Sequence, residues 1–268
     1  MARPVFFISD STGLTAEAVG KSLLAHFDMP FEEAILSFVD TEQKARSAVA
    51  KINRKAELNG YQPIVIETII DPAIRDIIHT SKGHIVDSIS SFLPQLETLL
   101  GQPASVVVGR PEVAQQEHYQ RRIDAMHYSI DNDDGAKIDK YDQADIILVG
   151  VSRSGKTPTS VFLSLQGGVY AANYPLNDDD FESNGLPRPL KPYQKKLYGL
   201  TIDPEHLAQI RNNRKANTRY ASIRQCEDEV RLAEMLFKRF NIPYIDTTRL
   251  SIEEIATRII VEKGLRQQ

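Results

Sequence analysis

Cysteine, tryptophan and long apolar runs are scarce or missing in this sequence of 268 residues. It contains one cysteine, Cys226, and no tryptophan. A single cysteine cannot form a disulfide within the chain, so we expect folding without oxidation in a reducing cytoplasm. No apolar run approaches the ~18 residues of a membrane span, and the run from Val5 to Ile8 is too short for a signal-peptide core. The sequence therefore predicts a soluble, cytoplasmic protein with no membrane partner.

A net positive charge is missing as well. The 32 lysines and arginines are outnumbered by 36 aspartates and glutamates, which gives a formal net charge of -4. Such a chain has no global field that attracts nucleic acid, so nucleic acid is not an expected partner, although local basic clusters can still act. Apolar residues make up 41% of the chain and charged residues 25%. These ordinary values exclude disordered, collagen-like and coiled-coil chains.

Short β-rich runs alternate with longer helical stretches, which is the pattern of an α/β fold. In the first part of the chain, strands are expected over residues 5–9, 34–39, 64–70 and 84–88, with helices between them. Asp40, with Gln43 three residues later, is expected to cap the second helix, and Asp71 before Pro72 the third. The stretch 92–144 has weaker apolar runs and is expected to form helices and loops that join two lobes.

The second part of the chain repeats this alternation. Strands are expected over residues 145–150, 197–202 and 244–246, and helices over 156–165, 228–240 and 252–263. Residues 174–192 are rich in turn formers and are expected to form a loop. Asp203 with Pro204 is expected to cap one helix, and Ser251 with Glu254 to form a capping box for the last.

The sharpest motif is Gly-Val-Ser-Arg-Ser-Gly-Lys-Thr over residues 150–157, which fits the phosphate-binding P-loop. Its glycines let the backbone curl so that amides point at an anion, and the following helix adds its dipole. Lys156 is expected to reach the terminal phosphates, and the Thr157 hydroxyl to bind Mg²⁺. The alternative is a strand-to-helix turn that binds nothing. The candidate nucleotide-binding residues are Gly150, Val151, Ser152, Arg153, Ser154, Gly155, Lys156 and Thr157.

With this motif in place, the sequence predicts an α/β fold of two lobes. Residues 1–143 are expected to form an N-terminal α/β lobe with a helical connector. Residues 144–268 are expected to form a C-terminal, kinase-like P-loop lobe with a mostly parallel sheet.

A basic cluster follows the loop, and it has two interpretations. It fits a clamp on a transferring phosphoryl group, because arginine offers bidentate hydrogen bonds, and it equally fits a solvated helix face. Its members are Arg211, Arg214, Lys215, Arg219 and Arg224.

Three acidic positions are further candidates. Asp10 follows the first strand, where ligands collect in open α/β sheets, and a plain helix cap is the alternative. Asp133, in an acidic turn, is a candidate general base or magnesium ligand, or part of a solvated turn. Asp203 is either a residue on the metal side of the site or only a helix cap.

Several stretches together resemble one family. They are residues 7–13, 133–135 with Tyr141 and Asp142, 147–159 and 171–175. The most specific is Ser-Arg-Ser-Gly-Lys-Thr-Pro, because Arg153 and Pro158 extend the bare P-loop pattern. Over nearly its whole length the chain is similar to the bacterial phosphoenolpyruvate synthase regulatory proteins, a family that also includes the regulatory proteins of pyruvate, phosphate dikinase.

The resemblance implies a bifunctional enzyme. One activity uses ADP to phosphorylate a threonine of a target protein and inactivate it. The other uses inorganic phosphate to remove that group, releasing pyrophosphate and restoring activity. Gly155 and the Thr159-Ser160 continuation favour phosphoenolpyruvate synthase as the partner, with pyruvate, phosphate dikinase as the alternative target.

For this chemistry, Lys156 and Arg153 are expected to offset charge on the transferring group, and Asp10 or Asp133 to take the threonine proton. A homodimer is also expected. Two other functions fit the same motif: an ATP-dependent kinase of a small metabolite, and a nucleotide sensor without enzymatic activity.

Overall fold

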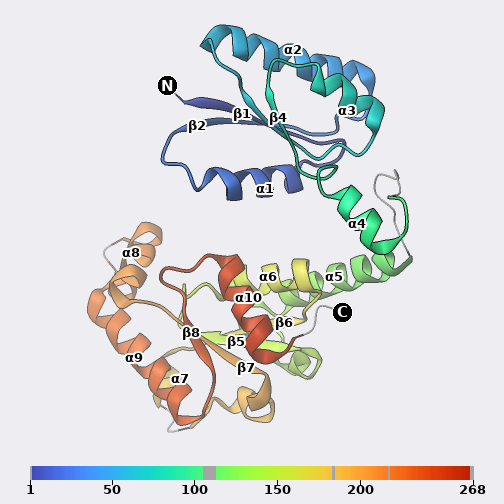
Figure 1. Cartoon of the computed structure of the whole chain (residues 1–268). Coiled ribbons are helices and arrows are strands. Elements are labelled where there is room, and N and C mark those ends of the chain that lie inside the picture. The colour runs from blue at the N-terminus through green and yellow to red at the C-terminus, as the bar shows by residue number, and fades with distance from the viewer. Residues whose placement is uncertain (1, 105–112, 183–184, 217, 266–268) are drawn as a thin grey trace. The chain divides into compact units, whose positions relative to one another are not determined.

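Two parallel sheets organise the computed structural model, which describes residues 2–104, 113–182, 185–216 and 218–265 (Figure 1). The chain divides into two units, Met1–Arg110 and Pro111–Gln268, and each is described by itself. Each unit holds a four-stranded sheet in its described residues, and every strand pair is parallel. The predicted α/β fold with two lobes is confirmed.

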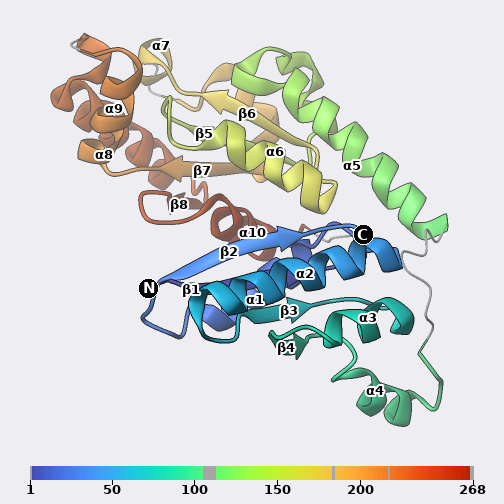
Figure 2. The ribbon, with the colours of Figure 1, turned by 90° about the horizontal axis from the view of Figure 1, so that it is seen from above.

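In the first unit the strands lie in the order β2-β1-β3-β4. Helices α2 and α3 lie on one face of this sheet and α1 on the other (Figure 1 and Figure 2). Apolar side chains of β1 alternate between these faces, so that Phe6 and Ile8 pack with α2 and α3 and Val5 and Phe7 with α1. A sheet covered on both faces requires strands that are apolar throughout, as β1 is. The elements are β1 (Arg3–Ile8), α1 (Leu14–Leu24), β2 (Phe31–Leu36), α2 (Glu42–Asn59), β3 (Ile64–Glu67), α3 (Pro72–His79), β4 (His84–Asp87) and α4 (Leu93–Leu100).

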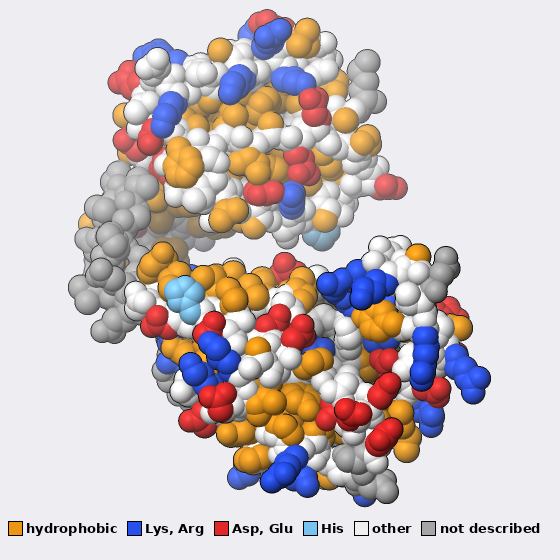
Figure 3. All heavy atoms as spheres, turned by 180° about the vertical axis from the view of Figure 1, so that it is seen from behind, with side chains coloured by type: hydrophobic (Ala, Val, Ile, Leu, Met, Phe, Trp, Pro, Cys, Tyr) orange, Lys and Arg blue, Asp and Glu red, His pale blue; other side chains and the backbone are white. Residues whose placement is uncertain are grey.

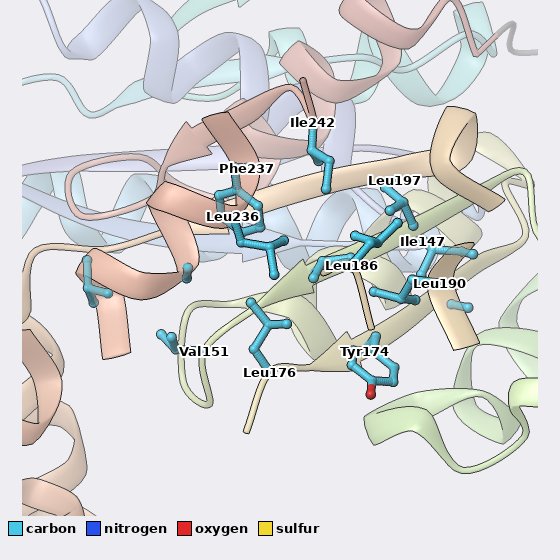
Figure 4. Close-up of a cluster of buried hydrophobic side chains, with 14 of the residues drawn as sticks. Ile147, Val151, Tyr174, Leu176, Leu186, Leu190, Leu197, Leu236, Phe237 and Ile242 are labelled. Carbon is cyan, nitrogen blue, oxygen red and sulfur yellow. The ribbon is translucent and has the colours of Figure 1, made fainter. Parts of the chain in front are cut away.

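The second unit has the strand order β6-β5-β7-β8. Helices α6 and α10 cover one face of this sheet, and α8 and α9 the other. Figure 4 shows the larger core cluster, to which Ile147, Leu197 and Phe237 all belong. The helices and strands are α5 (Val113–Asp131), β5 (Ile146–Gly150), α6 (Lys156–Gly167), β6 (Ala171–Pro175), α7 (Asp178–Glu182), β7 (Leu197–Thr201), α8 (Pro204–Arg214), α9 (Ile223–Arg239), β8 (Tyr244–Asp246) and α10 (Ile252–Lys263). Short 3₁₀ turns lie at Asp133–Gly135, Ile138–Gln143, Arg188–Lys196 and Arg219–Ala221.

Most predicted helix caps are confirmed. The Asp71 carboxylate accepts the Ala73 N–H at 2.9 Å, and Asp203 accepts that of His206 at 2.9 Å. Both hydrogen bonds of the Ser251–Glu254 capping box are present. Asp40 was the wrong residue for the cap of α2. Thr41 holds that position, because its backbone is extended and its hydroxyl accepts the Lys44 N–H.

Segment boundaries differ from the prediction at several places. Strand β6 was missed inside a stretch expected to be partly loop, because Ala171 and Ala172 are small and give no strong apolar run. Helix α9 begins at Ile223 rather than 228, since Ser222 caps it. The division between units falls at 110, whereas the expected lobe boundary was 143, because α5 packs against α6 and β6 of the second unit.

The surface charges and the described helices also bear on the expectations from the sequence. Acidic and basic side chains are interspersed over the face drawn in Figure 3, as the small net charge leads one to expect. Among the described helices, none combines the length and the apolar character that a bilayer crossing requires.

Gly20 gives a test of how α1 packs on the sheet. A Cβ at this position would lie closer than 3.0 Å to the Phe7 ring and 2.9 Å from Cδ1 of Ile66. Gly20→Ala is therefore expected to lower the free energy of unfolding by about 1–3 kcal/mol through overpacking. Ser22→Ala, on the exposed side of the same helix, is expected to stay within about 0.5 kcal/mol. Urea denaturation followed by circular dichroism measures both, and equal stability of the two variants would contradict this packing.

Candidate active site

The residues of the predicted P-loop lie between β5 and α6, as expected from the sequence. Strand β5 is buried along its length and ends at Gly150, where a Cβ would lie closer than 3.0 Å to the Leu200 carbonyl oxygen. The loop then turns through two residues with left-handed backbones, Arg153 (φ 77°) and Gly155 (φ 89°). Glycine adopts this region freely, whereas an arginine there is strained. The loop is thus held in a curled conformation that opens at the N-terminus of α6.

Lys156, the first residue of α6, is buried with 4% of its surface exposed. Its Nζ donates a hydrogen bond to the Val151 carbonyl oxygen at 2.9 Å. Burial lowers the pKa of its ammonium from 10.5 to about 8, although the carboxylates of Asp134 and Asp133 act in the opposite direction. Among the described residues no carboxylate hydrogen-bonds to this ammonium, whose acceptor is a carbonyl oxygen of the same loop. A buried cation of this kind is suited to bind an anion.

Asp133 reaches the loop from the 3₁₀ turn after α5. Its carboxylate accepts a hydrogen bond from the Thr157 hydroxyl at 2.9 Å, and a second from the side-chain amide of Asn173. Asn173 is fully buried on β6, and its side-chain oxygen accepts the Asp134 N–H at 2.8 Å. The acidic turn is therefore fastened to the sheet, and it places one carboxylate on the P-loop threonine.

A cavity of about 520 Å³ opens in front of these groups. It combines cationic side chains from the loop and from α8 with the two carboxylates of the acidic turn. The residues that line it are Asp133, Asp134, Ser152, Arg153, Gly155, Lys156, Thr157, Pro158, Ile210 and Arg214. A second cavity, of about 530 Å³, shares Ser152 and Arg214 with the first and is also lined by Lys215, Thr218 and Tyr220.

Arg211 has a different position from the rest of the basic cluster, because it is fully buried. Its guanidinium donates to the carbonyl oxygens of Ser152 and Tyr220, each at 3.0 Å, and to the Glu229 carboxylate at 2.6 Å. It also stacks 4.1 Å from the centre of the Tyr220 ring. Arg211 therefore fastens α8 and α9 to the P-loop backbone rather than offering its charge to the cavity.

The remaining members of the cluster divide between the cavities and other surface. Arg214 lines both cavities and Lys215 the second one, whereas Arg219 and Arg224 line neither. Cys226 is fully buried beside Arg211, and burial raises the pKa of its thiol. This cysteine therefore packs in the core of the second unit.

Two further acidic candidates make other contacts. Asp203 caps α8 and lines a separate cavity with Asp246 and Arg249. Asp10 belongs to the first unit, where its carboxylate accepts the Ile70 N–H at 2.8 Å and so links the end of β1 to the segment after β3. Gly13 rather than Asp10 is the cap residue of α1. The role of Asp10 as a base stays a prediction.

Asn173, Asp134 and Tyr220 were not singled out individually from the sequence. Asn173 is a buried polar residue in a strand. In the sequence it could be recognised only as one polar residue between two alanines and a tyrosine. Tyr220 bonds the Ser152 hydroxyl at 3.0 Å across 68 positions, a proximity that no local pattern encodes.

The buried ammonium of Lys156 predicts a stability that depends on pH. Between pH 8 and 10.5 the unfolded chain holds a proton that the folded chain has lost, so the free energy of unfolding rises with pH through this window. The total rise is on the order of 3 kcal/mol. Urea denaturation of the wild type and of Lys156→Met measures it as the difference between the two proteins. An equal pH dependence in both would contradict a buried, titrating Lys156.

The two arginines of α8 are expected to differ in their effect on stability. Arg211→Met leaves Glu229 without its cation and is expected to cost about 3–5 kcal/mol. Arg214→Met, on an exposed side chain, is expected to change stability by no more than about 0.5 kcal/mol. The comparison uses the midpoint and slope of urea denaturation, and a stable Arg211→Met protein would exclude the fastening role of Arg211.

Comparisons with known proteins agree with the family resemblance predicted from the sequence. Residues 5–260 match the family model described as kinase/pyrophosphorylase. The chain is 49% identical to a protein of Hahella chejuensis and 51% identical to one of Chromohalobacter salexigens, in each case over 100% of this chain and 99% of the relative. A protein of Pseudomonas aeruginosa is 49% identical over 100% of this chain and 98% of its own length. All three carry the provisional name phosphoenolpyruvate synthase regulatory protein. The chain described here therefore belongs to the kinase/pyrophosphorylase family.

Proposed function

We propose that this protein is a bifunctional regulator of phosphoenolpyruvate synthase. It phosphorylates a threonine of the synthase with ADP as the donor, and it removes that phosphoryl group with inorganic phosphate, releasing pyrophosphate. The observation that carries the proposal is the convergence of Lys156, Thr157 and Asp133 on one cavity at the start of α6. The names of its relatives support the synthase as target, and the family description supports a phosphotransferase with two activities.

The two reactions are chemically alike, which explains how one site serves both. In the kinase direction the bond from the β-phosphorus to the bridging oxygen breaks, and AMP leaves as a phosphate oxyanion. In the phosphorolysis direction an oxygen of inorganic phosphate attacks the phosphorus of phosphothreonine, the bond from that phosphorus to the threonine oxygen breaks, and pyrophosphate is the product. In both cases a phosphoryl group passes between a threonine oxygen and a phosphate oxygen, so the same cationic cradle stabilises both transition states.

The lining of the cavity suits this charge distribution. Lys156, Arg153 and Arg214 bring three cationic side chains to it. Two phosphate groups have to approach each other in either direction, and their repulsion is offset by these cations and by the amides at the start of α6. Arg211 contributes by holding the Ser152 carbonyl and with it the shape of the loop.

Magnesium fits the oxygen atoms that the site presents. The Thr157 hydroxyl and the Asp133 carboxylate lie together at 2.9 Å, and hydroxyl and carboxylate oxygens are the ligands that Mg²⁺ prefers. In P-loop enzymes an aspartate and the loop threonine hold this ion, which neutralises developing charge on the phosphates. Under this proposal Asp133 and Thr157 would hold the ion, and the 2.9 Å contact between their oxygens supports it.

The proposal is tested with purified protein, phosphoenolpyruvate synthase and ADP labelled at the β-phosphate. The label is expected on a threonine of the synthase, with AMP as the other product. Adding inorganic phosphate without nucleotide is expected to release labelled pyrophosphate from the modified synthase. Transfer from ATP to a small molecule, or tight ADP binding without any transfer, would contradict the proposal. Transfer to pyruvate, phosphate dikinase in place of the synthase would correct the target.

Lys156→Ala is expected to abolish both directions, because both pass through the same phosphate cradle. The loss is expected to be at least about 100-fold in each direction, as for removal of a group that stabilises transition-state charge. Initial rates of label transfer and of pyrophosphate release measure it. A variant that kept phosphorolysis while it lost kinase activity would contradict a shared site.

A further inference from the structure

Two carboxylates of the first unit lie side by side on one face of its sheet. Glu67 ends β3 and Asp87 ends β4, and the two residues are direct register partners in this parallel pair of strands. Register partners present their side chains on the same face of a sheet. Glu67 is fully buried and Asp87 is partly buried. Adjacent like charges destabilise a sheet, and a buried carboxylate is normally paired with a cation or bound to a metal.

A histidine from α3 covers this pair of carboxylates. His79 is the last residue of the helix, and its Nε2 lies 3.2 Å from Glu67 Oε1. The helix packs on the same face of the sheet, since Ile78 shares a core cluster with Val65, two residues before Glu67 on β3. One ligand atom from each of Glu67, His79 and Asp87 lies within 4.8 Å of the other two. The His79 side chain is 39% exposed, so the cluster is reached from solvent.

Backbone hydrogen bonds fix the orientation of both carboxylates. The Ile69 N–H donates to Glu67 Oε2 at 2.6 Å. The N–H groups of Ile89 and Ser90 donate to Asp87 Oδ1 at 3.1 and 2.7 Å. Each carboxylate therefore keeps a second oxygen that no backbone N–H of the described residues occupies. Carboxylates that bind metals are held by hydrogen bonds in this way.

We propose that Glu67, His79 and Asp87 form a binding site for one Zn²⁺ ion. A divalent cation balances both carboxylates, whereas the imidazole of His79 carries a charge only when it is protonated. An imidazole nitrogen favours zinc over magnesium, which prefers oxygen ligands alone. Three protein ligands leave the fourth position of a tetrahedral zinc site to water. The site lies in the first unit, so the inference goes beyond the phosphotransfer function proposed above and does not depend on it.

The spacing of the three side chains suits a zinc ion. Ligand atoms about 2.1 Å from a tetrahedral zinc lie roughly 3.4 Å from one another. The contact between His79 Nε2 and Glu67 Oε1, at 3.2 Å, is already close to this value. The separations within the cluster reach no more than 4.8 Å, which small side-chain rotations reduce to the required distance. The bound ion joins the end of α3 to the ends of β3 and β4.

Calorimetric titration of the full-length, tag-free protein with ZnCl₂ tests the proposal after treatment with a chelator. An excess of Mg²⁺ is present throughout, so that sites made of oxygen ligands alone, such as Thr157 with Asp133, do not contribute. One Zn²⁺ ion per chain is expected to bind. Loss of a residue that only orients a ligand already costs about 10–100-fold in metal affinity, so Glu67→Gln and His79→Gln are each expected to weaken binding at least tenfold.

His84→Gln is the matched control. His84 is an exposed histidine at the start of β4, the strand that ends in Asp87, and it lies outside the cluster. Its Zn²⁺ affinity is expected to match that of the wild type. Circular dichroism checks that each variant is folded, and His79→Gln changes a side chain that is partly exposed.

Nuclear magnetic resonance of the wild type gives a second readout that needs no variant to fold. One equivalent of Zn²⁺ is expected to shift the ring-nitrogen signals of His79 and to leave those of His84 unchanged. A wild-type protein that binds no Zn²⁺ under these conditions, or whose Zn²⁺ is displaced by the excess of Mg²⁺, would overturn the proposal. So would equal affinity of the wild type and His79→Gln, or an equal loss of affinity in His84→Gln.

Discussion

The buried ammonium of Lys156 is the interaction on which the second unit depends. A lysine that is 4% exposed has given up most of its hydration, and its nearest hydrogen-bond acceptor is a carbonyl oxygen of its own loop. The surrounding structure offsets that cost through the two carboxylates of the acidic turn. Under the proposed function, an anion bound in the loop would lower this cost further, so that part of the free energy of phosphate binding would come from relief of the buried charge.

A second buried cation makes this arrangement rigid. Arg211 binds two carbonyl oxygens and a carboxylate, and through them it joins α8, the turn at Arg219–Ala221 and α9 to the P-loop. Its charge is fully paired, whereas that of Lys156 is not. Two cations that lie close in the same core therefore have opposite tasks: one fixes the shape of the cradle and the other remains available to a ligand.

Local patterns in the sequence were sufficient for the fold class, the strand and helix on either side of the glycine-rich motif, and most caps, because periodicity, glycine and capping side chains act over a few residues. The sequence did not predict strand β6, because two small alanines followed by a polar asparagine give no strong apolar run. Ala171, Ala172 and Asn173 are nevertheless all buried. The roles of Arg211 and Asp133 depend on contacts with residues 59 and 24 positions away. The sequence alone reveals a basic cluster and an acidic turn. Tertiary packing decides which residue of each is buried and which lines the cavity. The first unit shows the same division: its sheet and the Asp71 cap followed from the sequence, whereas the bond from Asp10 to Ile70 spans 60 positions.

The hydrogen bond between Thr157 and Asp133 has a consequence for the order of assembly. A divalent cation entering between these oxygens has to compete with the hydroxyl proton that already bridges them at 2.9 Å. Without phosphates the binding free energy of the ion would be small, because the two protein oxygens replace only part of its shell of water ligands. With phosphate oxygens present the ion gains further ligands, and the competition turns in its favour. Under the proposed function, metal and nucleotide would therefore be thermodynamically linked: each would raise the affinity for the other by the same factor, and the hydrogen bond between Thr157 and Asp133 would disfavour binding of the ion without phosphates.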